Sequence, residues 1–252
     1  AANPHGRAAC EYPGDAACAS CHGDGKAHME AGGDKSLIGG LHGAKGSEAC
    51  LKCHDVTTEH TSFRDGIHGA TEAVNCLTCH SIHTPVAKER KLLAKTQTKL
   101  CGSCHQGQTS AMESKAYVHH LDRGGFTCAT CHNPHGRKGE GMLKLTRQGD
   151  LPCLNCHNEK RGPYVFEHVG PTVSAMQGGC LSCHEPHGSN NPKMLVRSNV
   201  AQLCLECHSS LAASAIGSQP PATHNIQLPR WRNCTTCHVA VHGSNRSPKL
   251  LK

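Results

Sequence analysis

Large aromatic side chains are scarce in this chain of 252 residues, where Phe, Trp and Tyr make up only 3%. A globular domain of this length normally builds its core on large apolar side chains. The polypeptide alone has too little apolar surface to offset the entropy lost on folding. We therefore expect bound groups to supply most of the core, and the chain without them to be largely unfolded.

Long hydrophobic runs are also missing, and no stretch approaches the apolar length of a membrane span. The formal net charge is +7, but no Arg-rich or aromatic platform accompanies it, which argues against nucleic-acid binding. The chain begins Ala-Ala-Asn-Pro, which is typical of a mature end left by cleavage at a small-residue site. We therefore expect an exported protein. The end carries no cysteine that could be lipidated, so we expect no lipid anchor.

Cysteine, by contrast, is abundant and patterned. Eighteen of the nineteen cysteines lie in nine copies of Cys-x-x-Cys-His, the attachment motif of c-type haem. The two thiols add across the haem vinyl groups, and the histidine reaches the iron from the same side. The predicted attachment thiols are Cys18, Cys21, Cys50, Cys53, Cys76, Cys79, Cys101, Cys104, Cys128, Cys131, Cys153, Cys156, Cys180, Cys183, Cys204, Cys207, Cys234 and Cys237. The predicted proximal iron ligands are His22, His54, His80, His105, His132, His157, His184, His208 and His238.

Other uses of paired cysteines do not fit this pattern. Zinc sites pair two such elements around one metal and require no histidine after each second cysteine. A redox dithiol occurs as one motif, iron–sulfur proteins use other spacings, and disulfide scaffolds are shorter. The remaining Cys10 is interpreted as a buried or unreactive thiol, with an intermolecular disulfide as the alternative. Ionised propionates of nine haems would take the net charge from +7 to about −11, so the sequence pI of 8.6 is a poor guide to partners.

The motifs fall into two types that alternate with a period near 52 residues, as in a stacked repeat array. Type I motifs have one histidine just beyond them, the companion histidine, and another 8 to 12 residues before them, the upstream histidine. Type II motifs lack both and follow a short apolar–basic element. A last copy of this element, residues 247–252, has no motif after it, and we expect the array to end there. Type I motifs start at Cys76, Cys128, Cys180 and Cys234. Type II motifs start at Cys101, Cys153 and Cys204. The apolar–basic elements before the type II motifs are residues 91–95, 142–145 and 194–197.

Thirteen histidines outside the motifs are enough to give every iron a second histidine. A companion histidine cannot wrap to the far face of the haem beside it, so it should ligate a different haem. One of the N-terminal histidines is expected to serve the ninth iron, and a surplus one, most plausibly His5, would reach a haem of another subunit. His60 and His120 are predicted to be surface histidines, and no methionine occupies a repeated ligand position. The distal candidates are His5, His28, His42, His68, His83, His119, His135, His168, His187, His224 and His242.

Glycine and proline, 27 and 13 residues, are scattered between the motifs and break longer elements. The predicted fold is a multihaem cytochrome c: mostly irregular chain with short α-helices and little β-structure, wrapped around stacked haems. Each motif is expected to form one helical turn, with further short helices in residues 109–119 and 200–211. We predict a single elongated domain over residues 1–252, with the repeat clearest over 68–252.

Several segments resemble the MtrA/DmsE family of decahaem cytochromes: residues 21–28, 156–168, 183–190 and 237–245. The resemblance covers almost the whole chain, which matches the second to tenth haems of the family, while only Pro4-His5-Gly6 stands where the first would be. It implies an extended periplasmic cytochrome. Its implied partners are redox donors and acceptors, an outer-membrane β-barrel porin and a surface multihaem cytochrome.

Three functions are compatible with these patterns. The first is an electron conduit of nine bis-histidine haems between periplasmic donors and an outer-membrane or extracellular acceptor. The second is a subunit of an extracellular haem filament, which a ligand donated between chains would reveal. The third, a multihaem reductase, needs an open iron. It is disfavoured because all nine motifs end in histidine, and we expect no dedicated catalytic site.

Overall fold

The computed structural model describes residues 5, 16–55, 60, 62–71, 73–85, 90–123, 126–136, 140–145, 151–168, 179–208, 224 and 228–251. The chain divides into two compact units. Unit 1 comprises residues 1–104 and 127–143, and unit 2 comprises residues 105–126 and 144–252.

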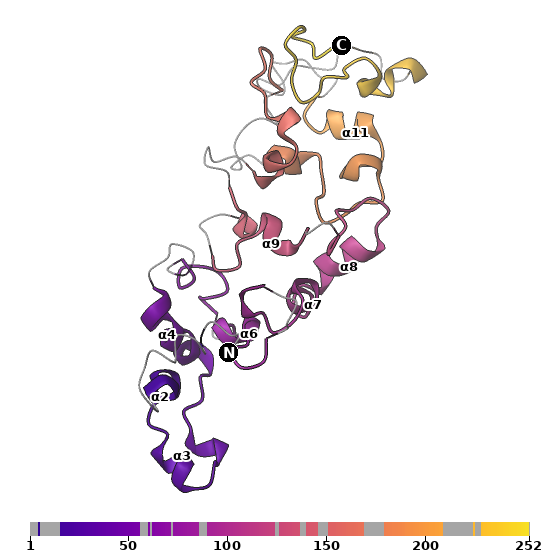
Figure 1. Ribbon diagram of the computed structural model, residues 1–252. Coiled ribbons are helices and arrows are strands. Elements are labelled where there is room, and N and C mark those ends of the chain that lie inside the picture. The colour runs from indigo at the N-terminus through magenta and orange to yellow at the C-terminus, as the bar shows by residue number, and fades with distance from the viewer. Residues whose placement is uncertain are drawn as a thin grey trace. The chain divides into compact units, whose positions relative to one another are not determined.

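Both units consist of short helices joined by irregular chain (Figure 1). Within the described ranges, β-structure is limited to isolated bridges, so the predicted fold class is confirmed. No described helix is long and apolar enough to cross a membrane. Unit 1 contains α2 (Ala16–His22), α3 (Lys26–Glu30), η1 (Lys35–Leu37), α4 (Gly43–His54), α6 (Cys76–Cys79), η2 (Arg90–Leu92), α7 (Gln97–Gly102), α9 (Cys128–Cys131) and η3 (Glu140–Met142). Unit 2 contains α8 (Gln106–Ser114), η4 (Pro152–Asn155), η5 (Asn158–Lys160), η7 (Gly179–Ser182), η8 (Pro192–Met194), α11 (Val200–Leu205), η9 (Pro229–Trp231) and η10 (Cys234–Thr236).

The four type I motifs form single helical turns, as predicted: α6, α9, η7 and η10. The motif that starts at Cys50 instead ends the 12-residue helix α4. In α6 the Asn75 side chain accepts hydrogen bonds from the N–H groups of Leu77 and Thr78, and Thr78 Oγ1 accepts one from the Asn75 N–H at 3.0 Å. This reciprocal cap starts a helix too short to be stable by propensity alone. The turn ends where His80 becomes extended, with φ −105° and ψ 141°, while its N–H still bonds the Cys76 carbonyl. Both thiols are thereby held on one turn, and the histidine is directed away from it.

Two further helices were expected from the sequence. The helix expected in residues 109–119 begins earlier, as α8, and ends at Ser114. It stops because Lys115 turns into extended chain, so that Tyr117 can pair with Ser189. The helix expected in residues 200–211 is present in part, as α11, which ends at Leu205 and which Asn199 caps by accepting from the N–H groups of Ala201 and Gln202. Residues 209–211 lie outside the described part.

The polypeptide has almost no core of its own. Among the described residues, the buried hydrophobic side chains are Leu51, Phe63, Leu151 and Ala201, and none of them is less than 5% exposed. Large apolar side chains such as Ile67 and Val165 are 62% and 70% exposed. Burial on this scale supplies little of the hydrophobic stabilisation that a domain of this length needs. The structure therefore agrees with a fold in which bound groups complete the core.

Successive repeats are joined by short two-way backbone pairs. Tyr117 and Ser189 exchange N–H···O=C bonds of 3.0 Å in both directions, and Phe166 and Ser244 do the same at 2.8 Å. Each serine follows the glycine after a companion histidine, while the aromatic residue lies two positions before an upstream histidine. These pairs fix the upstream histidine of one repeat beside the companion histidine of the next.

The glycine after a companion histidine is required by both its conformation and its neighbours. Gly136 has φ +98°, a region that L side chains rarely adopt. A Cβ atom there would lie 2.5 Å from the Ser62 carbonyl oxygen and 2.8 Å from the Gly66 Cα. Gly188 and Gly243 show the same combination of positive φ and close neighbours.

Replacing Gly136 by alanine should lower the free energy of unfolding of the haem-loaded protein by about 1–3 kcal/mol, because backbone must move to admit the methyl group. Gly107→Ala is the matched control. Gly107 lies in α8 with open space around its Cα, so its replacement should be neutral or stabilising by up to about 1 kcal/mol. Denaturant unfolding followed by circular dichroism measures both. Equal effects of the two changes would contradict the close approach at Gly136.

Candidate haem-binding site

Five motif histidines have the same hydrogen bond on the ring nitrogen that does not face the iron. In each, Nδ1 lies within bonding distance of a backbone carbonyl, which can only accept, so Nδ1 carries the proton and Nε2 keeps its lone pair for a metal. The bonds join His22 to Gly39 (3.3 Å), His80 to Lys91 (2.8 Å), His132 to Gly141 (2.5 Å), His184 to Lys193 (2.8 Å) and His238 to Lys249 (2.6 Å). We call this arrangement the carbonyl clamp.

Four of the five clamps are made by an apolar–basic element or by the residue directly before it. From the sequence, these elements are connected only with the type II motif that follows. The structure adds a second role, because each element folds back on the type I motif before it. Lys91 and Leu92 have φ of +62° and +58°, which turns the Lys91 carbonyl toward the His80 ring and lets the Leu92 carbonyl accept from the Ser81 N–H. Gly141-Met142 and Lys193-Met194 repeat this left-handed pair. The signal in the sequence is the recurrence of the element 9 to 11 residues after each type I histidine.

The upstream histidines are fixed in a similar way, but by the following repeat. The Nδ1 atoms of His68, His119 and His168 bond the carbonyls of Pro134, Pro186 and Val241 at 3.0, 3.1 and 2.9 Å. These carbonyls belong to the residues directly before companion histidines, 66 to 73 positions further along the chain. Their Nε2 atoms are left available as acceptors of a metal bond.

Motif histidines face non-motif histidines at a nearly constant distance. Two imidazoles that bind one iron from opposite sides have ring centroids about 6 Å apart, since each Fe–N bond is about 2 Å and each nitrogen lies about 1 Å from its ring centre. The observed centroid distances are 6.1 Å for His22–His83, 6.0 Å for His80–His135, 6.4 Å for His157–His119, 6.3 Å for His184–His242, 6.0 Å for His208–His168 and 6.3 Å for His238–His224. The donor sets therefore fit a bis-histidine haem iron.

These distances reveal a pairing rule within the two units. A companion histidine faces the motif histidine two motifs earlier, as His83 faces His22 and His242 faces His184. The upstream histidines His119 and His168 face the next type II histidines, His157 and His208, whereas His224 faces His238 of the type I motif directly after it. The rule agrees with the expectation that companions serve a different haem. His68 and His187 hold equivalent places in the sequence, and their ligation stays a prediction.

The second motif has two histidines near its own. The ring of His5 lies 5.8 Å from that of His54, close to the distance for a shared iron. His60 lies 5.4 Å from His54 and 5.2 Å from His135, edge-on to both. His60 is half-buried, with its ring close to those of two other histidines, and its expected role as a spare histidine stays a prediction. His120 is exposed, as expected.

The remaining candidates lie elsewhere in the described chain. His42 is exposed where α4 begins, and His28 lies in α3. His224 is stacked on Trp231 with ring centroids 4.3 Å apart and planes 2° from parallel, and the Arg230 guanidinium lies 4.8 Å from the indole centroid. Sequence reasoning did not assign a role to this only tryptophan of the chain. Cys10 lies outside the described residues.

Burial keeps several distal candidates uncharged. Burial is the main cause that lowers the pKa of His168 and of His242. It also lowers the pKa of His5, with the neighbouring His54 as the next cause. Neutral imidazole is the form that binds iron, so these environments favour ligation. Among the described residues, no three His, Cys, Asp or Glu side chains gather around one point, and the histidines occur as facing pairs.

Thiols of successive motifs touch one another. The hydrogen bond between Cys50 and Cys76 lowers the pKa of Cys76 to about 6 and raises that of Cys50. Cys101 is bonded to Cys128 in the same way, which raises its pKa. In each case a motif meets the type I motif that follows it in the chain. The helices that carry these motifs also pack in pairs, α4 on α6 and α7 on α9 (Figure 1). Haems attached at these thiols would have neighbouring edges.

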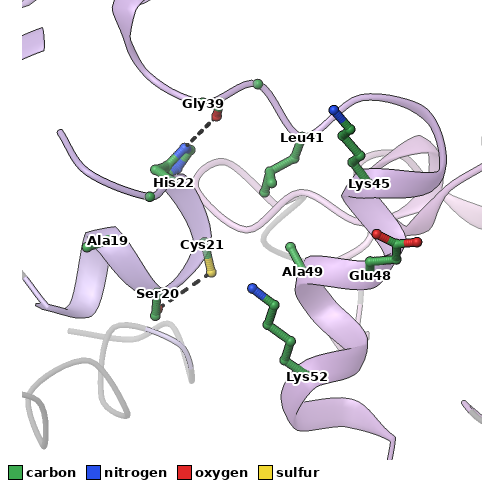
Figure 2. A pocket seen from close by; sticks show the side chains of 12 residues that line it. Ala19, Ser20, Cys21, His22, Gly39, Leu41, Lys45, Glu48, Ala49 and Lys52 are labelled. Atoms are coloured by element: carbon green, nitrogen blue, oxygen red, sulfur yellow. Dashed lines mark hydrogen bonds between the residues drawn. The ribbon is translucent and has the colours of Figure 1, made fainter. Parts of the chain in front are cut away.

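A hollow of about 320 Å³ lies beside the first motif. Figure 2 shows Cys21 and His22 on one side and the α4 side chains Lys45, Glu48 and Lys52 on the other. The two lysines offer positive charge to the propionates of a haem held there, which favours their ionised form.

Lys91→Val should open the carbonyl clamp at His80, because a β-branched residue is strongly disfavoured at φ +62°. Without the bond the imidazole is a weaker donor to ferric iron. One haem should then become easier to reduce, by on the order of 40 mV if about 1 kcal/mol is lost. A redox titration followed by electron paramagnetic resonance measures the change. Lys95→Val, in the same element but without positive φ, should leave all potentials unchanged, and a shift of equal size there would contradict the clamp.

Comparison with known proteins agrees with this site. A family model described as a doubled CXXCH motif matches residues 68–110, 119–162 and 174–213, each stretch spanning a type I motif and the type II motif after it. The chain is 34% identical over 248 residues to the multihaem cytochrome MtrA of Shewanella baltica (strain OS185), which covers 93% of this chain and 70% of that protein. With c-type attachment motifs along its whole length and histidines facing in pairs, the chain belongs to the MtrA family of multihaem c-type cytochromes.

Proposed function

We propose that this protein is an electron conduit that carries nine bis-histidine haems. The observation that carries the proposal is the recurrence of facing histidine pairs, His5–His54 and the six others, at centroid distances of 5.8 to 6.4 Å. Bis-histidine haem iron accepts and releases single electrons without binding a substrate. The polypeptide then sets spacing, orientation and potential.

Specific residues perform these tasks. The carbonyl clamp holds a proximal imidazole in one orientation and raises its basicity, which favours the ferric state and low potentials. The distal imidazoles of His119 and His168 are oriented in the same way by the following repeat. Contacts such as Cys50–Cys76 and Cys101–Cys128 support short electron-transfer distances between the haems attached there.

The partners follow from this role. An exported conduit needs a redox protein that donates electrons in the periplasm and an acceptor at the outer membrane or outside the cell, with an outer-membrane porin as a further partner. The shared family with a multihaem cytochrome supports redox partners in general. The position of His5 beside His54 of the same chain supports a discrete conduit over a filament joined by that histidine.

Replacing His5 by alanine should leave one of the nine irons without a distal ligand. The purified ferric protein should then show a high-spin signal in electron paramagnetic resonance, equivalent to one haem, which the wild type lacks. His60→Ala is the matched control, because His60 is close to His54 but edge-on to it. It should leave all haems low-spin. A high-spin signal in His60→Ala but not in His5→Ala would reverse the assignment.

A conduit should also be inert toward small ligands. Carbon monoxide binds ferrous haem only at an open position, so the reduced wild-type spectrum should not change under carbon monoxide. An oxidised soluble c-type cytochrome in excess should remove nine electrons from each reduced molecule in a stopped-flow experiment. A spectral change under carbon monoxide equivalent to one haem, or steady turnover of nitrite, would show an iron with an open position and would contradict the conduit proposal.

A further inference from the structure

The facing histidine pairs differ in the angle between their two ring planes. Four of the pairs described above are close to parallel, with interplanar angles of 9° to 23° and centroid distances of 6.0 to 6.3 Å. The other three have centroid distances of 5.8 to 6.4 Å, so distance does not separate the two classes. These three are tilted, by 57° for His119–His157, 45° for His224–His238 and 53° for His5–His54.

An aromatic ring lies against the distal histidine of two of the tilted pairs. His119 is stacked on Phe126, with ring centroids 5.1 Å apart and planes 19° from parallel. His224 is stacked on Trp231, with ring centroids 4.3 Å apart and planes 2° from parallel. In both cases the aromatic residue follows the upstream histidine by seven positions. Since the same spacing occurs in two repeats, the stack is a feature of the repeat and not of one loop.

His168 is the comparison for His119, because the residue at the same spacing after it is Ala175, which has no ring. The Nδ1 of His168 bonds a carbonyl of the following repeat at 2.9 Å, as that of His119 does at 3.1 Å. The ring of His168 is nevertheless only 18° from that of His208, against 57° between His119 and His157. The carbonyl bond is therefore compatible with either angle, and the aromatic residue distinguishes the tilted pair.

Both aromatic rings are held in place by their own backbone. The Phe126 N–H donates to the Arg123 carbonyl at 3.1 Å, and the Phe126 carbonyl accepts from the Asp122 N–H at 2.8 Å. Trp231 ends the η9 turn, where its N–H donates to the Leu228 carbonyl at 3.0 Å. These bonds do not involve the histidines, so each ring can set the rotation of the imidazole that stacks on it.

We propose that Phe126 and Trp231 are positioning residues, which hold the imidazoles of His119 and His224 at an angle to the imidazoles they face. This rests on the bis-histidine assignment proposed above. Parallel imidazoles raise the energy of one of the two iron d orbitals that interact with their π electrons, which stabilises the electron vacancy of ferric iron. Tilted imidazoles keep these two orbitals closer in energy, so the ferric state gains less. Each of the two haems is therefore easier to reduce than it would be with parallel ligands.

Electron paramagnetic resonance of the ferric protein measures the tilt, because the largest g value of a low-spin haem rises as the two imidazole planes open. In the wild type, at least the three haems of the tilted pairs should have raised values. Phe126→Leu and Trp231→Leu should each shift one haem to a smaller value while every haem stays low-spin, and the double variant should shift two. A wild type in which all haems have the g values of parallel ligands would overturn the proposal without any variant.

Two controls separate orientation from packing. Tyr117 is an aromatic residue two positions before His119 and is 42% exposed, so Tyr117→Leu should leave the g values unchanged. Trp231→Phe keeps a ring at the stacking position and should retain the raised g value that Trp231→Leu loses. Unchanged g values in Phe126→Leu, or an equal shift in Tyr117→Leu, would contradict the proposal.

A redox titration followed by the same resonance gives the second readout. The haem whose g value falls in Phe126→Leu or Trp231→Leu should also become harder to reduce, while the other haems keep their potentials. An unchanged or higher potential at that haem would contradict the proposal. A failure of the bis-histidine assignment is distinct from all these results, because it would appear as high-spin haem in the wild type.

Discussion

The hydrogen bond from a histidine Nδ1 to a backbone carbonyl is the interaction on which the other features of this structure depend. It fixes the tautomer, so that Nε2 can bind iron, and it fixes the direction of the ring. The carbonyl that accepts it comes from another part of the chain in each case. For His80 it belongs to the apolar–basic element, for His184 to the residue directly before such an element, and for His119 and His168 to the following repeat. Each bond therefore couples the chemistry of one iron to the folding of a segment that has no other strong reason to be ordered.

That coupling explains how a chain with so little core can have a defined fold. The described residues bury few apolar side chains, and the backbone pairs Tyr117–Ser189 and Phe166–Ser244 are isolated bridges that a peptide in water would not keep. An iron that binds two histidines from different repeats closes long loops at once, and loop closure becomes only slowly more costly with length. Metal-ligand bonds and porphyrin surface thus replace the hydrophobic core, as in other small metal-dependent folds.

The features that depend only on neighbouring residues could be predicted from the sequence. The spacing of the cysteines predicts single-turn motifs, and these are present because an i to i+4 bond needs only neighbouring residues, as between Cys76 and His80. The alternation of two motif types also identified the companion and upstream histidines. Contacts 66 to 73 residues apart could not be derived, since nothing local in Pro134 or Pro186 indicates that its carbonyl meets a histidine of the preceding repeat. The same limit explains why the neighbours of His60 and the second role of the apolar–basic elements were not foreseen, since these partners are determined by how repeats pack and not by local composition.

The pairing rule also gives the array a direction. In the proposed assignment, a type I iron takes its distal ligand from the repeat that follows, so that each repeat completes the one before it. The last of the nine motifs differs, because its histidine, His238, faces the upstream histidine of its own repeat, His224. His224 is held differently from the other upstream histidines described, by stacking on Trp231 with Arg230 over the indole. An aromatic stack supplies locally the orientation that a carbonyl of the next repeat supplies elsewhere. The last of the nine motifs therefore differs from the type I motifs before it, because the histidine that faces its own comes from its own repeat.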